Sequence, residues 1–310
     1  MNTDYEVIVI GGGAAGLSAA VALGRSRRSV LVVDAGEPRN APAAGVHNFL
    51  SREGAAPGTL LEAGRAEVEQ YGGQIRTARA TGAEKLADDL FAVTLDDCAR
   101  VTARRLVVTT GLVDELPELE GLRQRWGRDV LHCPYCHGWE VRDQTIAVLG
   151  VGPGSVHQAL LFSQLTDDLT LVTHDFDLDE DSRQMLDSAG VRVVDGRAVA
   201  VEVADDAVTG LRLEDGGLVP ATAITVASYM RARSEVLTSL GVETVPHASG
   251  MGEHVVIDEM LQTSVPGVYA AGNVTDLSAQ VMGAAAAGTM AGARANADLV
   301  MSDTRERISA

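Results

Sequence analysis

The feature that most constrains this chain is a glycine-rich turn between a short apolar run and a small-residue helix. Residues 5–10 are apolar and lead into the segment 11–16, GGGAAG, after which an Ala- and Leu-rich stretch continues to about Gly24. A second apolar run, 29–33, follows and ends at Asp34. This order predicts a strand, a turn, a helix and a parallel strand, which together make one βαβ unit of an α/β fold.

The three glycines that fit G-x-G-x-x-G each have a physical use. Gly11 permits the tight turn, Gly13 lets a diphosphate approach the backbone, and Gly16 lets the helix and strand pack closely. The diphosphate then lies against N–H groups at the positive end of the helix. Asp34 is placed where a carboxylate accepts hydrogen bonds from ribose hydroxyls. The turn therefore predicts a dinucleotide site.

The same pattern returns twice along the chain. A second strand, glycine turn, helix and strand are predicted at 145–149, 150–155, 156–165 and 169–173. The C-terminal part returns to the first style, with a strand, a tight turn and a long small-residue helix at 267–271, 272–274 and 279–299. We therefore predict an α/β protein with two Rossmann-like dinucleotide-binding domains, the second inserted into the first. The outer domain would comprise 1–113 and 238–310, and the insert 114–237.

The chemical centre of the sequence is the pair Cys133-Pro-Tyr-Cys136, followed at once by His137. On a turn that opens a helix, two such sulfurs approach disulfide distance, and the positive helix end stabilises a thiolate. A zinc site would need two more ligands, for which only Cys98, His132 and His137 are candidates. A purely structural pair is the other alternative. We expect a redox pair and no metal, with His137 or His132 as the acid/base group near neutral pH.

Charge and composition exclude several classes of partner. The formal net charge is −18, whereas nucleic acids and anionic membranes require a basic face. The apolar run at 7–23 follows Asp4 and Glu6, where a signal peptide would carry basic residues. Three cysteines are too few for a secreted disulfide framework. We therefore expect a cytoplasmic protein with no nucleic-acid or membrane partner.

The second glycine turn departs from the first. Ser155 occupies its third small position, and no Lys or Arg occurs from residue 143 to residue 182. The strand after the turn ends at Asp175, and further acidic residues follow it. Because a 2′-phosphate needs cationic donors at this point, the insert is expected to hold NADH poorly and NADPH worse, or to hold no nucleotide at all.

The order of these motifs resembles low-molecular-weight thioredoxin reductases over essentially the whole chain. The motifs that carry the resemblance are the first glycine turn, Thr109-Thr110-Gly111, the C-x-x-C pair, the second glycine turn, and Ala270-Ala271-Gly272-Asn273-Val274. The resemblance implies FAD in the outer domain and NADPH in the insert, within a homodimer. The residues it would place at FAD are Gly11, Gly13, Ala14, Ala15, Gly16, Asp34, Ala35, Arg39, Asn40, His47, Thr110, Gly111, Gly272, Asn273, Gln280 and Val281. It also implies that Cys136 lies beside the flavin and that Cys133 exchanges with substrate.

Two departures from that family change the expected reaction. The reductases carry an Asp after the second cysteine, where this chain has His137, and an Arg-rich run that is missing here. The form Cys-Pro-Tyr-Cys-His-Gly-Trp is more similar to the dithiol oxidases of holomycin- and gliotoxin-type antibiotic biosynthesis. This resemblance implies oxidation of a small-molecule dithiol, with dioxygen as the acceptor and hydrogen peroxide as the product. The alternatives are an NADPH-dependent thioredoxin-disulfide reductase with a thioredoxin-like protein as partner, and a non-catalytic flavin-binding redox sensor.

Overall fold

The computed structural model describes residues 4–309, which divide into two compact units. The first unit contains the chain up to residue 41, residues 49–113 and the chain from residue 230 onward. The second contains residues 42–48 and 114–229. The chain passes between the units at both ends of the segment 42–48 and inside β7 (Leu112–Glu115) and β16 (Tyr229–Ala232). The assignment of a cofactor to each predicted domain stays a prediction.

A seven-stranded sheet forms the centre of the first unit. Its strands follow the order β3-β2-β1-β6-β5-β4, and β19 also pairs with β6. The pairs that join β1 to β2 and to β6 are parallel, as a βαβ unit requires, whereas β4, β5 and β6 pair antiparallel. The strand bounds are β1 Tyr5–Ile10, β2 Val30–Asp34, β3 Gln74–Thr77, β4 Ala80–Ala87, β5 Leu90–Leu95, β6 Arg100–Val108 and β19 Val268–Ala270.

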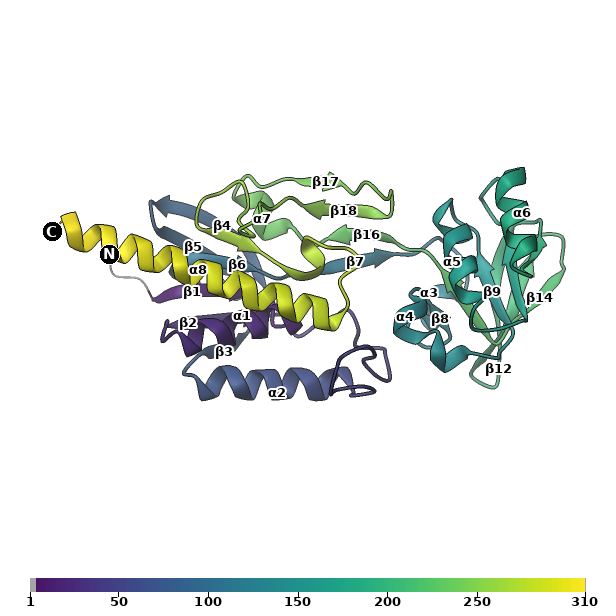
Figure 1. Ribbon diagram of the computed structural model, residues 1–310, viewed down its shortest axis with the longest axis horizontal. Coiled ribbons are helices and arrows are strands. Elements are labelled where there is room, and N and C mark those ends of the chain that lie inside the picture. The colour runs from purple at the N-terminus through teal and green to yellow at the C-terminus, as the bar shows by residue number, and fades with distance from the viewer. Residues whose placement is uncertain (1–3, 310) are drawn as a thin grey trace. The chain divides into compact units, whose positions relative to one another are not determined.

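Helices α1 (Ala14–Arg25) and α8 (Val281–Ser309) lie side by side in the first unit, as Figure 1 shows. Their close approach depends on glycines of α8. A Cβ added at Gly288 would lie 1.9 Å from the Ala15 carbonyl oxygen, and one added at Gly292 would lie 2.5 Å from that of Ala19. The small residues of the C-terminal segment therefore bring this helix onto the one that opens at the first glycine turn.

The remaining elements of the first unit include a second, four-stranded sheet in the order β17-β18-β16-β7. A 3-10 turn, η2, links β19 to the segment before α8. The bounds of the remaining helices and strands of this unit are α2 Pro57–Gln70, α7 Glu235–Ser239, β17 Thr244–Pro246, β18 Gly252–Val255 and η2 Gly272–Val274.

The second unit is built on a five-stranded sheet in which every pair is parallel, in the order β11-β10-β9-β15-β8. All residues of β9, β10 and β15 are buried, as expected for a parallel sheet covered on both faces. A three-stranded antiparallel sheet, β12-β13-β14, completes the unit. The bounds are β8 Val130–Leu131, β9 Ile146–Leu149, β10 Leu169–Val172, β11 Arg192–Val194, β12 Ala198–Ala204, β13 Ala207–Leu213, β14 Leu218–Pro220, β15 Ala223–Val226, α3 Leu122–Arg125, α4 Pro134–His137, η1 Trp139–Val141, α5 Gly154–Phe162 and α6 Glu180–Ser188.

The structure confirms the predicted α/β fold class and the strand–turn–helix–strand order around both glycine turns. Two helices differ from their predicted bounds. Helix α5 begins at Gly154 and ends at Phe162, and α8 extends to Ser309, ten residues beyond the predicted end. Within residues 4–309, no helix is both long and apolar enough to cross a membrane.

Candidate active site

The two cysteines lie at the start of α4, directly after the short strand β8. Cys133 is the N-cap, with an extended backbone, and Pro134 occupies the first turn, where its missing N–H costs nothing. The Cys133 carbonyl accepts hydrogen bonds from the N–H groups of Cys136 and His137, both at 3.2 Å. The two Sγ atoms are 2.7 Å apart, and both cysteines are half-buried. A disulfide needs about 2.05 Å, so a small movement is enough to join them.

His137 ends α4 and is half-buried beside the thiols. Burial is the main cause that holds the pKa of His137 below its ordinary value of 6.5. Glu140 opposes this shift by its negative charge, and His47 adds to it. At neutral pH His137 is therefore an uncharged imidazole, the form that accepts a proton from a thiol.

His132 precedes Cys133 and is held from two sides. Its Nδ1 lies 3.2 Å from the carbonyl oxygen of Val226, and its own carbonyl accepts a hydrogen bond from Gln158 Nε2 at 2.6 Å. Because a carbonyl only accepts, Nδ1 must carry the proton in that contact. The neutral ring of His132 then presents Nε2 as its basic nitrogen. Both histidines thus remain candidates for the base.

The segment 42–48, far upstream in the sequence, belongs to the same unit as the cysteines. It contacts residues 133–137, the redox turn. His47 Nε2 lies 3.4 Å from Glu140 Oε1, and its ring meets that of His137 edge to face at a centroid distance of 6.0 Å. The side-chain amide of Asn48 donates a hydrogen bond to the Tyr135 carbonyl at 2.7 Å. The predicted contact of His47 with a flavin stays a prediction, whereas Glu140 was missed by the sequence reasoning. The only signal was its position three residues after His137.

The first glycine turn has the shape that a diphosphate needs. Gly11 has φ +104°, and a Cβ there would lie 2.4 Å from the Thr109 carbonyl oxygen, while one at Gly16 would lie 1.8 Å from that of Gly11. Gly13, the N-cap of α1, has no protein atom within 4 Å of its added Cβ and no side chain to cap the helix. The turn is therefore tight where it meets the protein and open where a ligand would approach the helix end, so the residues fit a bound FAD.

Asp34, which ends β2, is already engaged by the protein. Its Oδ1 accepts a hydrogen bond from the Gly12 N–H at 3.0 Å, and Oδ2 lies 3.5 Å from Arg65 Nη2. Ala35 follows it, and Arg39 and Asn40 are half-buried in the turns after β2. Arg65, on α2, is a cation near this site that sequence reasoning did not identify, because nothing local links α2 to the end of β2.

Other predicted cofactor residues of the first unit gather around the same turn. A Cβ added at Gly272, which has φ +79°, would lie 3.0 Å from the Ala15 Cβ, so η2 lies against the start of α1. The side-chain amide of Asn273 donates to the Ala279 carbonyl at 2.9 Å, which fixes the turn before Gln280 and Val281 at the start of α8. The structure thus brings the segments 11–16 and 272–281 together. Their role in binding stays a prediction.

Thr110 and Gly111, which follow β6, are held by one neighbouring residue. The Thr110 hydroxyl donates to the Arg233 carbonyl at 2.5 Å, and the Gly111 carbonyl accepts from the Arg233 N–H at 3.0 Å. Gly111 has φ +75°, a conformation that suits glycine. The backbone of Arg233 therefore fixes the course of the chain where the sequence places these two cofactor residues.

The second glycine turn is partly satisfied by its own side chain. The Ser155 hydroxyl accepts a hydrogen bond from the Val151 N–H at 3.0 Å, and Pro153, the N-cap of α5, has no N–H to offer a phosphate. At the end of β10, Arg197 Nε lies 3.2 Å from Asp175 Oδ1. Sequence reasoning missed Arg197, because it follows β11, 22 residues after Asp175. Arg197, a cation beside this strand end, is thus already paired with a carboxylate.

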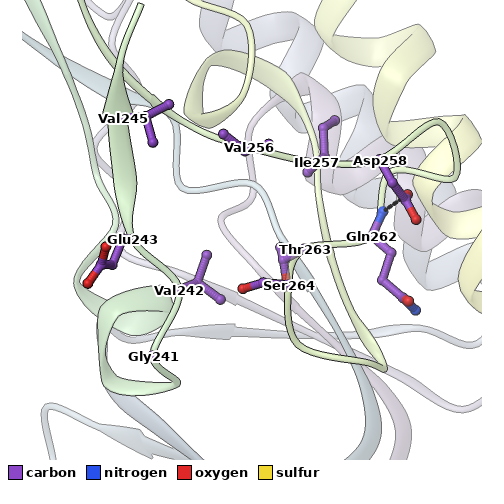
Figure 2. Close-up of a pocket in the computed structure, with 10 residues that line it drawn as sticks. All are labelled: Gly241, Val242, Glu243, Val245, Val256, Ile257, Asp258, Gln262, Thr263 and Ser264. Atoms are coloured by element: carbon purple, nitrogen blue, oxygen red, sulfur yellow. Dashed lines mark hydrogen bonds between the residues drawn. The ribbon is translucent and has the colours of Figure 1, made fainter.

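The first unit also contains an open hollow of about 460 Å³, shown in Figure 2. Apolar side chains of Val242, Val245, Val256 and Ile257 line part of it, and Asp258 and Gln262 lie at one end. None of the residues that line it is among the predicted site residues.

Comparison with known proteins gives consistent matches over nearly the whole chain. A sequence model of the family described as pyridine nucleotide-disulphide oxidoreductase matches residues 5–291. The chain is 30% identical to thioredoxin reductase tcpT of Claviceps purpurea, over 95% of this chain and 94% of that protein. Among solved structures, HlmI is 44% identical with a TM-score of 0.93, covering 98% and 95% of the two chains. An oxidoreductase from Agrobacterium tumefaciens is 36% identical with a TM-score of 0.89, covering 96% and 99%.

Proposed function

The chain belongs to the pyridine nucleotide-disulphide oxidoreductase family, and from this premise we propose that it is a dithiol oxidase. In the proposed reaction a small-molecule dithiol becomes a disulfide through Cys133 and Cys136, and the electrons pass through FAD to dioxygen to give hydrogen peroxide. The observation that carries the proposal is the redox turn itself. A half-buried His137, neutral at physiological pH, directly follows the second thiol.

Family membership confirms the coarser part of the sequence-based prediction. The protein is an FAD-dependent oxidoreductase that resembles the thioredoxin reductases and acts in thiol–disulfide chemistry. Its sequence is 44% identical to that of HlmI and 30% identical to that of tcpT. The identity of the dithiol, the use of dioxygen, the homodimer and the cytoplasmic location stay predictions.

The proposed binding site for FAD uses the first unit. Gly11, Gly13 and Gly16 would admit the diphosphate at the start of α1, and Asp34 would accept from the ribose. Asn273 and the start of α8 would face the rest of the cofactor. FAD, when bound, supplies a two-electron acceptor for the reduced cysteine pair.

The steps assigned to this chain's own residues balance in atoms and electrons. His137 or His132 takes the proton from one substrate thiol, and the resulting thiolate attacks Cys133 Sγ of the Cys133–Cys136 disulfide. The bond between the cysteines breaks, and Cys136 leaves as a thiolate. The second substrate thiol loses its proton to water, and its thiolate attacks the substrate sulfur joined to Cys133, which forms the substrate disulfide and releases Cys133 as a thiolate. The enzyme is left with two reduced cysteines, and the substrate has lost two electrons and two protons.

The second glycine turn favours the oxidase direction, because it offers few donors to the phosphates of NADPH. Pro153 and the internal Ser155–Val151 bond reduce the donors available to a diphosphate, and Asp175 would face a 2′-phosphate. Losing even one charge-assisted contact costs roughly 1.5–3 kcal/mol, about ten- to a hundredfold in affinity. The alternative is an NADPH-dependent thioredoxin-disulfide reductase. It is favoured by the name of tcpT and by Arg197, which could turn from Asp175 to a phosphate.

Anaerobic stopped-flow mixing of the purified holoenzyme decides between the two. We expect a dithiol such as dithiothreitol to bleach the flavin, and NADPH to bleach it slowly or not at all. On return of air, the bleached enzyme should consume dioxygen and release hydrogen peroxide. Cys133→Ser is the control, since it should abolish bleaching by the dithiol. Bleaching by micromolar NADPH within milliseconds would overturn the oxidase assignment in favour of the reductase.

A further inference from the structure

Three titratable side chains meet beside the thiols, and only one of them has a role in the reaction described above. His137 ends α4, and Glu140 lies on the next turn, η1. His47 comes from the segment 42–48, which ends 66 residues before the rest of this unit begins at Asp114. His47 Nε2 is 3.4 Å from Glu140 Oε1, and the His47 and His137 rings meet edge to face at 6.0 Å. The three side chains therefore form one cluster.

The loop that carries His47 is fixed against the redox turn by several contacts. Asn48 donates to the Tyr135 carbonyl at 2.7 Å, and Val46 is buried. Gly127 passes so close to Pro42 that an added Cβ would lie 2.7 Å from the proline Cβ. Because both ends of the loop are fastened, the position of His47 next to Glu140 is a feature of the fold.

The charges in the cluster act on His137 in opposite directions. The carboxylate of Glu140 favours the protonated imidazole, whereas a protonated His47 disfavours it. Of the elements packed against α4, η1 contributes Glu140, and α5 contributes only the exposed His157 as a titratable side chain. Arg142, which follows η1, places its guanidinium over the Trp139 ring at 4.0 Å. Besides the two cysteines of the same turn, Glu140 and His47 are thus the titratable neighbours whose charges act on the proton of His137.

We propose that Glu140 and His47 are positioning residues that, with His137, hold a single proton beside the two thiols. The inference rests on the proposed function. When a substrate S–H bond breaks, an N–H bond forms on His137, and the carboxylate of Glu140 stabilises the imidazolium. His47 Nε2 lies 3.4 Å from the same carboxylate, so one negative charge serves both rings. The proton then leaves to water at the exposed edge of Glu140, whose side chain is 38% exposed. No electron moves in these steps.

The test follows the His137 proton directly and does not depend on turnover. Histidine-labelled holoenzyme, with its cysteines reduced, is titrated by NMR from about pH 5 to about pH 9, and His137→Gln identifies the signal. In Glu140→Gln the midpoint for His137 should fall by about half a unit to one unit, because a neighbouring negative charge is lost. In His47→Gln it should rise, because a neighbouring positive charge is lost. Glu140→Asp keeps the charge and should restore most of the shift.

Controls separate this proposal from the proposed function. Glu214→Gln removes a charge from an exposed turn of the same unit and should leave the His137 midpoint unchanged. If dithiothreitol is not oxidised but the two variants shift the midpoint in opposite directions, the cluster stands and the oxidase assignment fails. If Glu140→Gln leaves the midpoint unmoved, or both variants shift it the same way, the cluster does not control His137 and the proposal is wrong.

Discussion

Replacing Gly13 by valine should remove the flavin and leave the protein folded. The backbone at Gly13 is extended, with φ −79° and ψ −172°, so an L residue is not strained there, and no protein atom lies within 4 Å of the added Cβ. The cost to the folded apoprotein should be about 1 kcal/mol or less, since the change affects only an N-cap. The side chain would fill the space through which a diphosphate reaches the helix end.

The size of the effect on FAD follows from the contacts that valine would block. Two charge-assisted hydrogen bonds from the start of α1 are worth roughly 1.5–3 kcal/mol each. Their joint loss of about 3–6 kcal/mol weakens binding by about a hundred- to ten-thousandfold. The assay is the ratio of visible to ultraviolet absorbance of the purified protein, together with its thermal melting after cofactor removal.

Two matched variants make this result interpretable. Gly58→Val adds the same side chain at another open position, in the first turn of α2, and should keep full flavin. Gly16→Ala places a methyl group 1.8 Å from the Gly11 carbonyl, so it should disrupt the turn and the fold itself. A folded Gly13→Val protein that keeps all its flavin would show that the cofactor binds elsewhere and that the domain assignment is wrong.

Three further predictions concern the thiols, the base and the stability of the first unit. Cys133→Ser should show a long-wavelength charge-transfer band from the remaining Cys136 thiolate, and Cys136→Ser should not; the reverse pattern would exchange their roles. His137→Asp should depress dithiol oxidation most near neutral pH, because a carboxylate is a far weaker base; an unchanged rate would move the base to His132 or to solvent. Arg105→Met, which removes the cation paired with Asp298 and Asp89, should lower the free energy of unfolding in urea by about 1–3 kcal/mol; a loss below about 0.5 kcal/mol would contradict this.

The sequence was sufficient to predict both βαβ units, because their signals are local. An apolar run, a glycine turn and a small-residue helix are contiguous, and the structure contains them in that order at 5–34 and at 146–172. The end of α8 was missed for a physical reason. Its small-residue pattern stops near Leu299, but Asp303 pairs with Arg28 at 2.9 Å and with Arg104 at 2.5 Å, so ion pairs continue the helix after the pattern ends.

The contacts of the candidate site could be predicted only where they are local in sequence. The spacing of Cys133 and Cys136 predicts that the thiols meet. They do meet, because the turn over residues 133–136 alone sets the distance between the two sulfurs. The pairing of His47 with Glu140 joins residues 93 positions apart, and neither residue carries a local signal for the other. Arg65 and Arg197 likewise pair with carboxylates distant in sequence, those of Asp34 and Asp175.

Glu140 and His47 affect how well a histidine directly after the second cysteine can act as the base. A base that accepts a proton from a thiol, whose ordinary pKa is about 8.5, becomes less effective as its own pKa falls. Burial lowers the pKa of His137. Glu140 offsets part of that loss without exposing the ring, and His47 keeps the carboxylate in place. The basicity of His137 thus depends on its burial, on Glu140 just after the cysteines and on a loop that the chain contributes long before them.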